Sequence, residues 1–247
     1  MADPPALTLF IAFLFCGGFS FLAYGMRVLD VPGTLLSFFL ALAIILSPGG
    51  FMWLVLLIGF VLFGFIVTKL FWAKKVEMGV AEGKKGVRGW RNVAANGLVP
   101  AIIALLGWWV ADQEIVLVGF VTAIAAASSD TFASELGVLS RRTYLVTHPW
   151  RRVAPGTNGG VSNWGHGMAL VGAIVPTVAA IPLVGLPWQA AWIPIVAGWV
   201  GCQIDSVLGA LFEEERGRAV QILTKADVNF LAIAVAAFGV LVLLATL

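Results

Sequence analysis

The sequence predicts an all-α fold: a polytopic integral membrane protein with about eight transmembrane helices in one domain over residues 1–247. Three observations predict it. Hydrophobic residues make up 60% of the chain and charged residues only 11%, whereas a water-soluble domain is about 25% charged. Apolar segments as long as a bilayer-crossing helix follow one another along the chain. The basic residues are confined to alternate connections between these segments, and little sequence is left over for a separate soluble domain.

Each apolar segment can be compared with the roughly 20 residues that a helix needs to cross the hydrocarbon core. The second segment is short, and Ser47–Gly50 forms a turn into the third. Prolines at positions 176, 182 and 194 are expected to kink the sixth and seventh spans. The predicted spans are Leu7–Tyr24, Gly33–Leu46, Phe51–Phe71, Val93–Val110, Ile115–Leu139, Gly165–Val184, Trp188–Phe212 and Val228–Leu247.

The distribution of charge predicts the orientation of these spans. All fifteen Lys and Arg residues fall in the odd-to-even connections or at the span ends beside them. The opposite side carries Asp3, Asp112 and Glu114 and no basic residue. By the positive-inside rule the basic side is cytoplasmic, and both termini are non-cytoplasmic. We therefore expect a protein integral to a cell membrane, the plasma membrane in a prokaryote, with any site among the basic connections on the cytoplasmic side.

The N-terminus and the cysteines add little to this prediction. The first residues lack the basic region of a signal peptide, so the first span is expected to be retained. Cys16 and Cys202 both lie in apolar spans, where a thiol behaves as a small hydrophobic side chain. They indicate no redox or metal chemistry.

Acidic residues inside the spans are the first candidates for a functional site. Asp130 lies eleven residues before Arg141, about 16 Å along a helix, and Asp205 lies eight residues before Glu213, about 12 Å. A carboxylate in the bilayer costs roughly 2.5 to 3.5 kcal/mol unless it is paired. Glu135 follows Asp130 in the same span. The alternative is a polar contact between helices, but two acids on separate helices at similar depth favour a buried acidic site.

A hard cation would make this shared burial tolerable. Mg²⁺ takes one or two carboxylates together with water and substrate phosphates, so Asp130, Glu135 and Asp205 are the predicted catalytic residues and Mg²⁺ ligands. His148 and His166 lack a partner at ligand spacing and are expected to be loop or interfacial residues. Nothing in the pattern indicates zinc or a transition metal.

The basic connections supply groups that can bind phosphate. The segment from Trp72 to Asn96 mixes glycines with six Lys and Arg residues but is not a P-loop, because no Ser or Thr follows its lysines. The alternative to a phosphate-binding role for this segment is a flexible basic loop. The Asn158–Gly160 run before the sixth span is either a turn or an anion nest at a helix start. The candidate binding residues are Arg88, Arg91, Asn96, Ser134, Thr157, Asn158, Gly159, Gly160, Ser162, Ser206 and Asn229.

Four motifs in order resemble a known family of small polytopic membrane proteins, which includes the phytyl-phosphate kinase of plant vitamin E salvage. Phe132 stands where that family is expected to have tryptophan, and Glu213–Glu215 where Gln or a basic residue is expected. The resemblance covers essentially the whole chain, and Asp227-Val228-Asn229 is also similar. The motifs are Arg88-Gly89-x-Arg91-Asn92-Val93-x-Ala95-Asn96-Gly97, Ser129-Asp130-Thr131-x-Ala133-Ser134-Glu135-Leu136-Gly137, Gly156-Thr157-Asn158-Gly159-Gly160-Val161-Ser162 and Asp205-Ser206-x-Leu208-Gly209-Ala210.

The resemblance implies a kinase for isoprenoid monophosphates, with a nucleoside triphosphate as donor. Its distant relatives, the phytol and dolichol kinases and the CDP-diacylglycerol synthases, favour CTP. The expected partners are the nucleotide, an isoprenoid phosphate lipid and membrane lipids; no nucleic acid is expected, and a homodimer is an alternative to a monomer. Two other functions fit the bare pattern. One is a lipid-phosphate transporter or translocase, and the other is a CTP-dependent nucleotidyltransferase.

Overall fold

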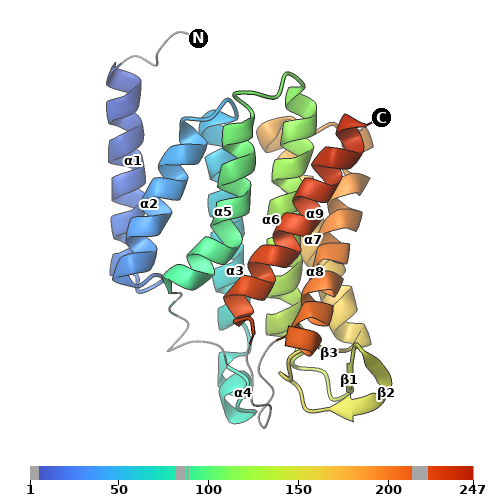
Figure 1. Cartoon of the computed structure of the whole chain (residues 1–247). Coiled ribbons are helices and arrows are strands. Elements are labelled where there is room, and N and C mark those ends of the chain that lie inside the picture. The colour runs from blue at the N-terminus through green and yellow to red at the C-terminus, as the bar shows by residue number, and fades with distance from the viewer. Residues whose placement is uncertain (1–5, 82–86, 88, 213–221, 247) are drawn as a thin grey trace.

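The computed structural model describes residues 6–81, 87, 89–212 and 222–246. The described chain is mostly helical, with long helices running side by side and a small sheet at one end of the bundle (Figure 1). This confirms the predicted helical membrane class. The sheet and one short helix were not predicted, and both lie in connections that were expected to be loops.

The helices coincide with the predicted spans to within a few residues. In the described part of the chain, five helices are long and apolar enough to cross a membrane, and three apolar helices are shorter. The prediction of eight crossings therefore remains a prediction for the three shorter helices. The elements are α1 Ala6–Gly25, α2 Val31–Ile45, α3 Gly50–Lys69, α4 Trp72–Glu77, α5 Trp90–Leu106, α6 Gln113–Gly137, β1 Thr143–Leu145, β2 His148–Val153, β3 Gly160–Val161, α7 Asn163–Val184, η1 Trp188–Ala190, α8 Trp192–Phe212 and α9 Lys225–Ala245.

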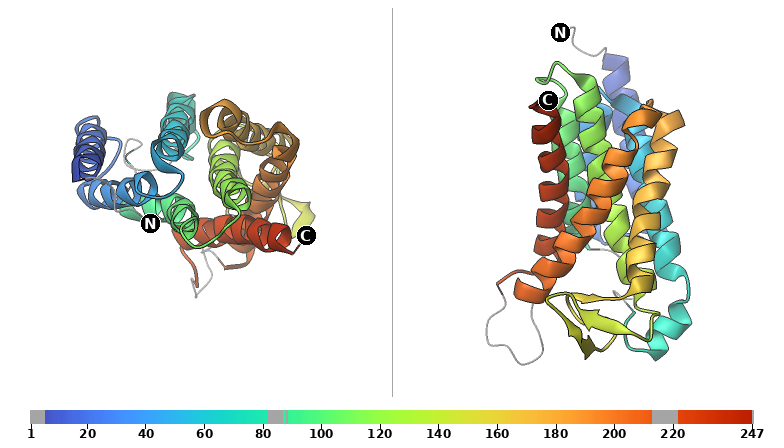
Figure 2. Two further views of the ribbon diagram at one scale, coloured as in Figure 1. Left: turned by 90° about the horizontal axis from the view of Figure 1, so that it is seen from above. Right: turned by 90° about the vertical axis from the view of Figure 1, so that its right-hand side faces the viewer.

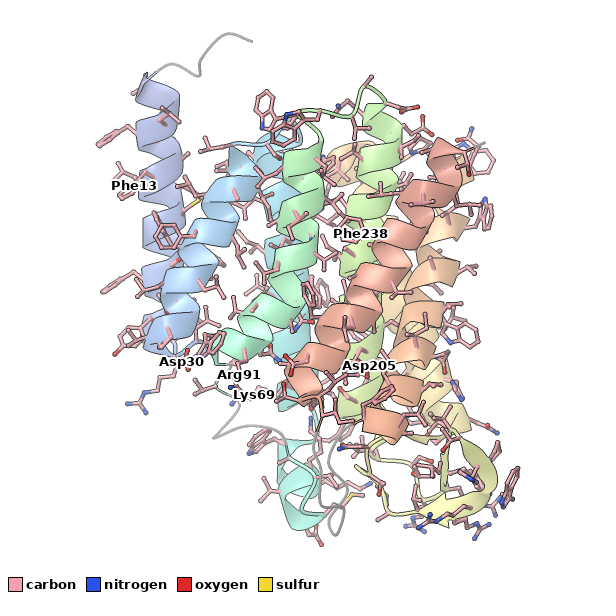
Figure 3. All side chains as sticks on the ribbon, viewed as in Figure 1. Phe13, Asp30, Lys69, Arg91, Asp205 and Phe238 are labelled. Atoms are coloured by element: carbon pink, nitrogen blue, oxygen red, sulfur yellow. The ribbon has the colours of Figure 1, made fainter. Side chains whose placement is uncertain are left out.

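Successive long helices alternate in direction, as the charge pattern requires. Helix α1 begins and α9 ends at one end of the bundle, whereas α4 and the sheet lie at the other (Figures 1 and 2). Lys69 and Arg91 both lie toward the sheet end (Figure 3). The sheet end is therefore the basic end, and we expect it to face the cytoplasm.

Polar side chains define where several helices begin. Asp30 caps α2 by accepting a hydrogen bond from Gly33 N at 2.7 Å. Thr224 and Asp227 form a reciprocal capping box at the start of α9. A capping side chain satisfies backbone N–H groups that have no partner inside the helix. The start of α9 is thereby set four residues before Asn229, a predicted site residue.

Helix α6 is the central element of the bundle. In its most apolar stretch of 18 residues, 89% of the residues are buried. The helix contacts α3, α5, α7, α8 and α9. Glycines let its neighbours approach closely: an added Cβ at Gly172 of α7 would lie 2.6 Å from the Ser128 carbonyl oxygen, and one at Gly198 of α8 would lie 2.8 Å from Ala125 Cβ. Small residues permit such close backbone approach between membrane helices. Asp130 and its neighbours are thus held on the most enclosed of the five described helices that are long enough to cross a membrane.

The connection between α6 and α7 folds into an antiparallel sheet with strand order β2-β1-β3. Thr143 pairs with Val153, and Tyr144 pairs with both Arg152 and Val161. The strands are short, and the edge strand β2 is almost fully exposed, so no alternating hydrophobic pattern predicts them. The sheet lies at the end of the bundle at which α6 ends and α7 begins (Figure 1).

Candidate functional site

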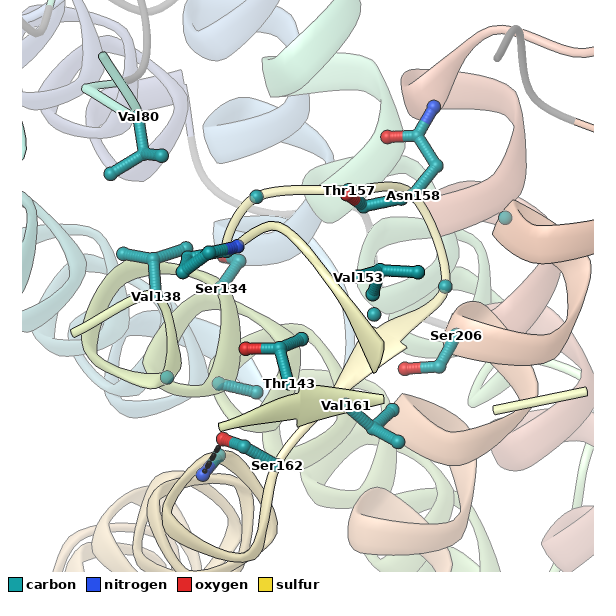
Figure 4. Close-up of a pocket in the computed structure, with 18 of the residues that line it drawn as sticks. Val80, Ser134, Val138, Thr143, Val153, Thr157, Asn158, Val161, Ser162 and Ser206 are labelled. Carbon is teal, nitrogen blue, oxygen red and sulfur yellow. Dashed lines mark hydrogen bonds between the residues drawn. The ribbon is translucent and has the colours of Figure 1, made fainter. Parts of the chain in front are cut away.

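A cavity of about 930 Å³ lies where α6, α7 and α8 meet the sheet. Ligand sites commonly have volumes of about 300 to 1,000 Å³, so the cavity can accommodate a nucleotide-sized molecule. Its walls come from segments far apart in the sequence (Figure 4). The predicted site residues that line it are Asp130, Ser134, Thr157, Asn158, Gly159, Gly160, Ser162, Asp205 and Ser206.

The two acids predicted to meet do line the same cavity. Asp130 comes from α6 and Asp205 from α8, the two helices being packed together. Cys202, one turn before Asp205, also lines the cavity. The arrangement results from the glycines of α8 that face the alanines of α6.

Asn229 connects the third helix of the site, α9, to this pair. Its Nδ2 donates a hydrogen bond to Asp130 Oδ2 at 3.2 Å. The residue is only 6% exposed, and its Oδ1 is buried without a hydrogen-bond partner. A buried amide oxygen without a donor is unfavourable and is well suited to a cation. The sequence motifs predict that Asn229 is a binding residue, but they do not predict its direct contact with Asp130.

The hydroxyl groups beside the acids donate to their own helices. Ser206 Oγ donates to the Cys202 carbonyl at 3.1 Å, and Ser134 Oγ donates to the Thr131 carbonyl at 3.3 Å. Serine commonly bonds back to its own helix in this way. The hydroxyl protons are used, but the oxygen lone pairs at the cavity surface can still accept hydrogen bonds or face a cation.

The glycine-rich loop before α7 is a tight turn against α8. Gly160 N donates to the Thr157 carbonyl at 2.8 Å, and Gly159, at the third turn position, has a φ of +69°. Such a turn requires a residue that tolerates positive φ. An added Cβ at Gly159 would lie 2.3 Å from Ala210 Cβ. Gly160 N–H is committed to the turn, so the predicted anion nest cannot use that group.

Ser162 has a structural role in addition to its place in the cavity wall. Its Oγ accepts a hydrogen bond from Gly165 N at 3.0 Å and caps α7. Figure 4 shows this bond at the edge of the cavity. The capped helix start adds a partial positive charge to the cavity.

Glu135 does not join the other two acids. It is one of the residues predicted to bind Mg²⁺, but its Oε2 lies 2.5 Å from Lys75 Nζ, and both side chains are buried. Residues five apart on a helix are about 140° apart around its axis, so Asp130 and Glu135 cannot both face the cavity. In this structure the Glu135 carboxylate is paired with a lysine and not with the other two acids, and its role as a metal ligand stays a prediction.

The predicted residues of α5 lie outside the cavity lining. Arg91 is exposed, its guanidinium 5.6 Å from the Trp90 ring centroid, and it is separated from Asp205 (Figure 3). Asn96 is 7% exposed; its Nδ2 donates to the Asn92 carbonyl at 2.8 Å, and its Oδ1 is buried without a hydrogen-bond partner. Arg88 lies outside the described residues, as do Glu213–Glu215. Arg91 and Asn96 are therefore not among the residues that line the cavity.

Comparison with known proteins assigns this chain to a family. The family described as integral membrane protein DUF92 matches residues 14–237. The chain belongs to the DUF92 family. It is 31% identical over 226 residues to the uncharacterized membrane protein MJ0933 of Methanocaldococcus jannaschii, covering 92% of this chain and 90% of that protein. No solved structure matches the chain.

Two plant proteins are also similar to this DUF92 chain. Protein PGR of Arabidopsis thaliana is 28% identical over 245 residues, covering 86% of this chain and 82% of that protein. The chloroplastic protein VTE6 of the same plant is 28% identical over 159 residues, covering 62% of this chain and 47% of that protein.

The structure adds cavity residues that sequence analysis did not select. Arg151 and Arg152 of β2 and Lys225 of α9 line the cavity, giving it a cationic side opposite in charge to the acids. His166 also lines it, whereas it was expected to be a loop or interfacial residue. The sequence does carry a signal for the two arginines. Residues 136–204 contain arginines but no Asp or Glu, so this stretch has only positive charge.

A hard cation fits the donor set of this DUF92 site. The candidate ligands are all oxygens: the carboxylates of Asp130 and Asp205 and the buried Oδ1 of Asn229. Among the described residues, no group of three or more His, Cys, Asp or Glu side chains could hold a metal. A site with two carboxylates and remaining positions for water or phosphate is typical of Mg²⁺. The residues present therefore fit Mg²⁺ with part of its coordination supplied by a substrate.

Proposed function

We propose that this protein is a membrane-embedded kinase that transfers the γ-phosphoryl group of a nucleoside triphosphate to an isoprenoid monophosphate. The observation that carries the proposal is a nucleotide-sized cavity lined by two partly buried acids from separate helices and by three basic residues. Phosphoryl transfer depends mainly on positioning and on neutralising charge. The motif resemblance to the family of the phytyl-phosphate kinase supports the same reaction, with CTP as the expected donor.

The acidic half of the cavity would hold Mg²⁺. Asp130, Asp205 and the Asn229 amide oxygen are the proposed ligands. Mg²⁺ would neutralise triphosphate charge when bound. Asn229 has a second task in the proposal, because its Nδ2 orients Asp130 through the 3.2 Å hydrogen bond.

The basic half of the cavity would bind phosphate oxygens. Arg151, Arg152 and Lys225 are among the residues that line the cavity, and arginine is suited to bidentate contact with phosphate. The Thr157–Gly160 turn forms the wall between β2 and α8. These groups would position the donor so that its γ-phosphate lies near the acids. Arg88 and Arg91 are proposed as further contacts for the acceptor phosphate.

The acceptor phosphate needs no strong base. A phosphate monoester has a second pKa near 6, so at neutral pH it arrives largely ionised. A free prenyl alcohol would instead require a residue to accept its proton, for which Asp130 is the candidate. The isoprenoid chain would remain among the helices, because its extraction costs about 0.8 kcal/mol per CH₂. We therefore propose the monophosphate as acceptor and the cytoplasmic membrane face as the place of reaction.

The test is product analysis with purified protein in detergent or nanodiscs. Mg²⁺, CTP and phytyl or geranylgeranyl phosphate are expected to give CDP and the prenyl diphosphate. Release of pyrophosphate with CMP retained on the lipid would identify a nucleotidyltransferase instead. Transport of the lipid phosphate across proteoliposomes without nucleotide, with no product formed, would overturn the kinase in favour of a translocase. ATP, GTP and UTP in parallel reactions define the donor.

A further inference from the structure

The buried Lys75–Glu135 ion pair lies outside the cavity lining, and the proposed reaction does not use it. Lys75 belongs to the six-residue helix α4 and is completely buried, an unusual state for lysine. Its Nζ donates to Glu135 Oε2 at 2.5 Å and to the Thr68 carbonyl at 2.6 Å, with the Val67 carbonyl at 3.5 Å. One ammonium group therefore joins the end of α3 to the last two turns of α6.

The approach of α4 to α3 depends on this ammonium group. Val67 and Thr68 belong to the last turn of α3, where carbonyl groups lack partners inside the helix. The chain turns back at Phe71, whose φ of 57° is unfavourable for a residue with a Cβ. The turn brings Lys75 beneath the carbonyls that it caps. A lysine at this position satisfies both the carbonyl groups of α3 and the carboxylate of α6.

Lys75 also anchors one wall of the cavity through its backbone. The Val80 N–H donates to the Lys75 carbonyl at 2.9 Å, and the Gly79 N–H donates to the Val76 carbonyl at 3.0 Å. With Gly79 at a φ of +69°, this is a Schellman motif that ends α4. The segment that leaves it, Gly79–Ala81, lines the cavity.

The wall anchored by Lys75 meets the glycine-rich loop on its other side. An added Cβ at Gly156 would lie 3.0 Å from Val80 Cγ1, so Val80 packs directly against the loop before α7. Figure 4 shows Val80 at the cavity, near the loop that carries Thr157. A chain of contacts thus runs from Glu135 through Lys75 and Val80 to the loop proposed to bind phosphate.

We propose that Lys75 and Glu135 form a positioning pair that fixes the Gly79–Ala81 wall of the cavity, and that Glu135 does not act on a metal or substrate. The effect on the cavity wall is independent of the reaction, whereas the effect on turnover rests on the proposed kinase function. Buried pairs tolerate joint replacement by apolar residues far better than loss of one partner. This difference separates a positioning pair from a catalytic glutamate.

The experiment uses Cys202 as a reporter that does not depend on activity. The chain has two cysteines, so Cys16→Ala leaves Cys202, which is 3% exposed and lines the cavity. In that background the rate of maleimide labelling is measured for Lys75→Met, Glu135→Gln and the double variant K75M/E135M. Lys74→Met is the matched control, because it removes the same charge from an exposed position of the same helix.

Each single variant is expected to label about tenfold faster than its parent, which corresponds to about 1.4 kcal/mol of wall opening. The double variant is expected to label nearly as slowly as the parent. The control Lys74→Met is expected to label at the same rate as the parent. Equal labelling rates in all variants would overturn the proposal. So would a double variant that labels as fast as the faster single variant.

Kinetics then test the consequence for catalysis. If the parent is active, the single variants are expected to raise the KM for nucleotide more than they lower kcat, and K75M/E135M to recover most of the activity. A double variant that folds, labels slowly and has no turnover would identify Glu135 as a catalytic residue. If the parent has no kinase activity, the proposed function fails, while the labelling rates still decide the role of the pair. If a single variant does not fold, the labelling rate of the double variant decides alone.

Discussion

On the face of α6 toward α8 and α9, Asp130 lines an open cavity and accepts a hydrogen bond from Asn229. On another face of the same helix, one and a half turns later, Glu135 is enclosed and bonded to Lys75. Both are acids at the same end of one helix, and both belong to the motif that resembles the prenyl-phosphate kinase family. Their surroundings nevertheless differ in what they allow: the first leaves room for a ligand, whereas the second is complete within the protein.

The difference shows that burial of an acid is not sufficient evidence for a metal site. A carboxylate whose charge is compensated by a lysine contributes to structure, whereas one that faces a cavity beside an unsatisfied amide oxygen can bind a cation. The distinguishing observation is the partner of each acid rather than its depth. The following variants test whether these two faces have separate roles.

The largest effects are expected from replacing each acid by its amide. Asp130→Asn is expected to lower turnover by about 10²–10³-fold, because one preorganised charge contact is lost, with little change in the free energy of unfolding. Glu135→Gln is expected to lower the free energy of unfolding by about 3 kcal/mol, because it breaks a buried ion pair. Turnover and thermal unfolding in detergent are measured for both.

The matched control for these two variants is Glu114→Gln. It removes one negative charge from the first turn of α6, at the end of that helix away from the cavity. It is expected to change neither turnover nor unfolding appreciably. If Asp130→Asn destabilised the fold and Glu135→Gln reduced turnover alone, the assignment of the two faces would be reversed.

An intermediate effect is expected at Asn229, which connects the cavity face to α9. Asn229→Leu keeps the side-chain volume but removes the proposed cation ligand and the donor to Asp130. We expect Mg²⁺ affinity to fall by about 10–100-fold, while stability stays equal or rises because a buried unsatisfied oxygen is removed. The Mg²⁺ dependence of turnover and the unfolding temperature are the readouts. An unchanged Mg²⁺ dependence would remove Asn229 from the cation site.

The smallest effect is expected from the glycine turn that borders the cavity. Gly159→Ala places a Cβ at positive φ and against Ala210, so we expect a loss of about 2 kcal/mol of stability and weaker nucleotide binding. Gly167→Ala is the control, because nothing lies within 4 Å of its added Cβ in α7. That variant is expected to gain about 0.5–1 kcal/mol. Equal stabilities of the two variants would show that the turn is not tightly packed against α8.

The face of α6 that carries Asp130 was more predictable from the sequence than the face that carries Glu135. Nine of the residues that line the cavity follow from the motifs and from the depth of the acids, since parallel directions of the fifth and seventh spans place Asp130 and Asp205 at the same end. Arg91 and Asn96 were grouped with them by sequence, but α5 holds them outside the lining. The strands of the Thr143–Val161 region escaped prediction because they are too short to show a period.

Composition and hydropathy by themselves determined the membrane class, the helical architecture and the end of the bundle at which the acids lie. These properties are local, because each span must satisfy its own backbone and bury its own apolar surface. Only the tertiary structure decided which carboxylate faces a cavity and which is neutralised. Lys75 and Glu135 are 60 residues apart in the sequence, and no local pattern connects them. Their pairing follows from the packing of α3, α4 and α6, which determines where the ammonium group can reach.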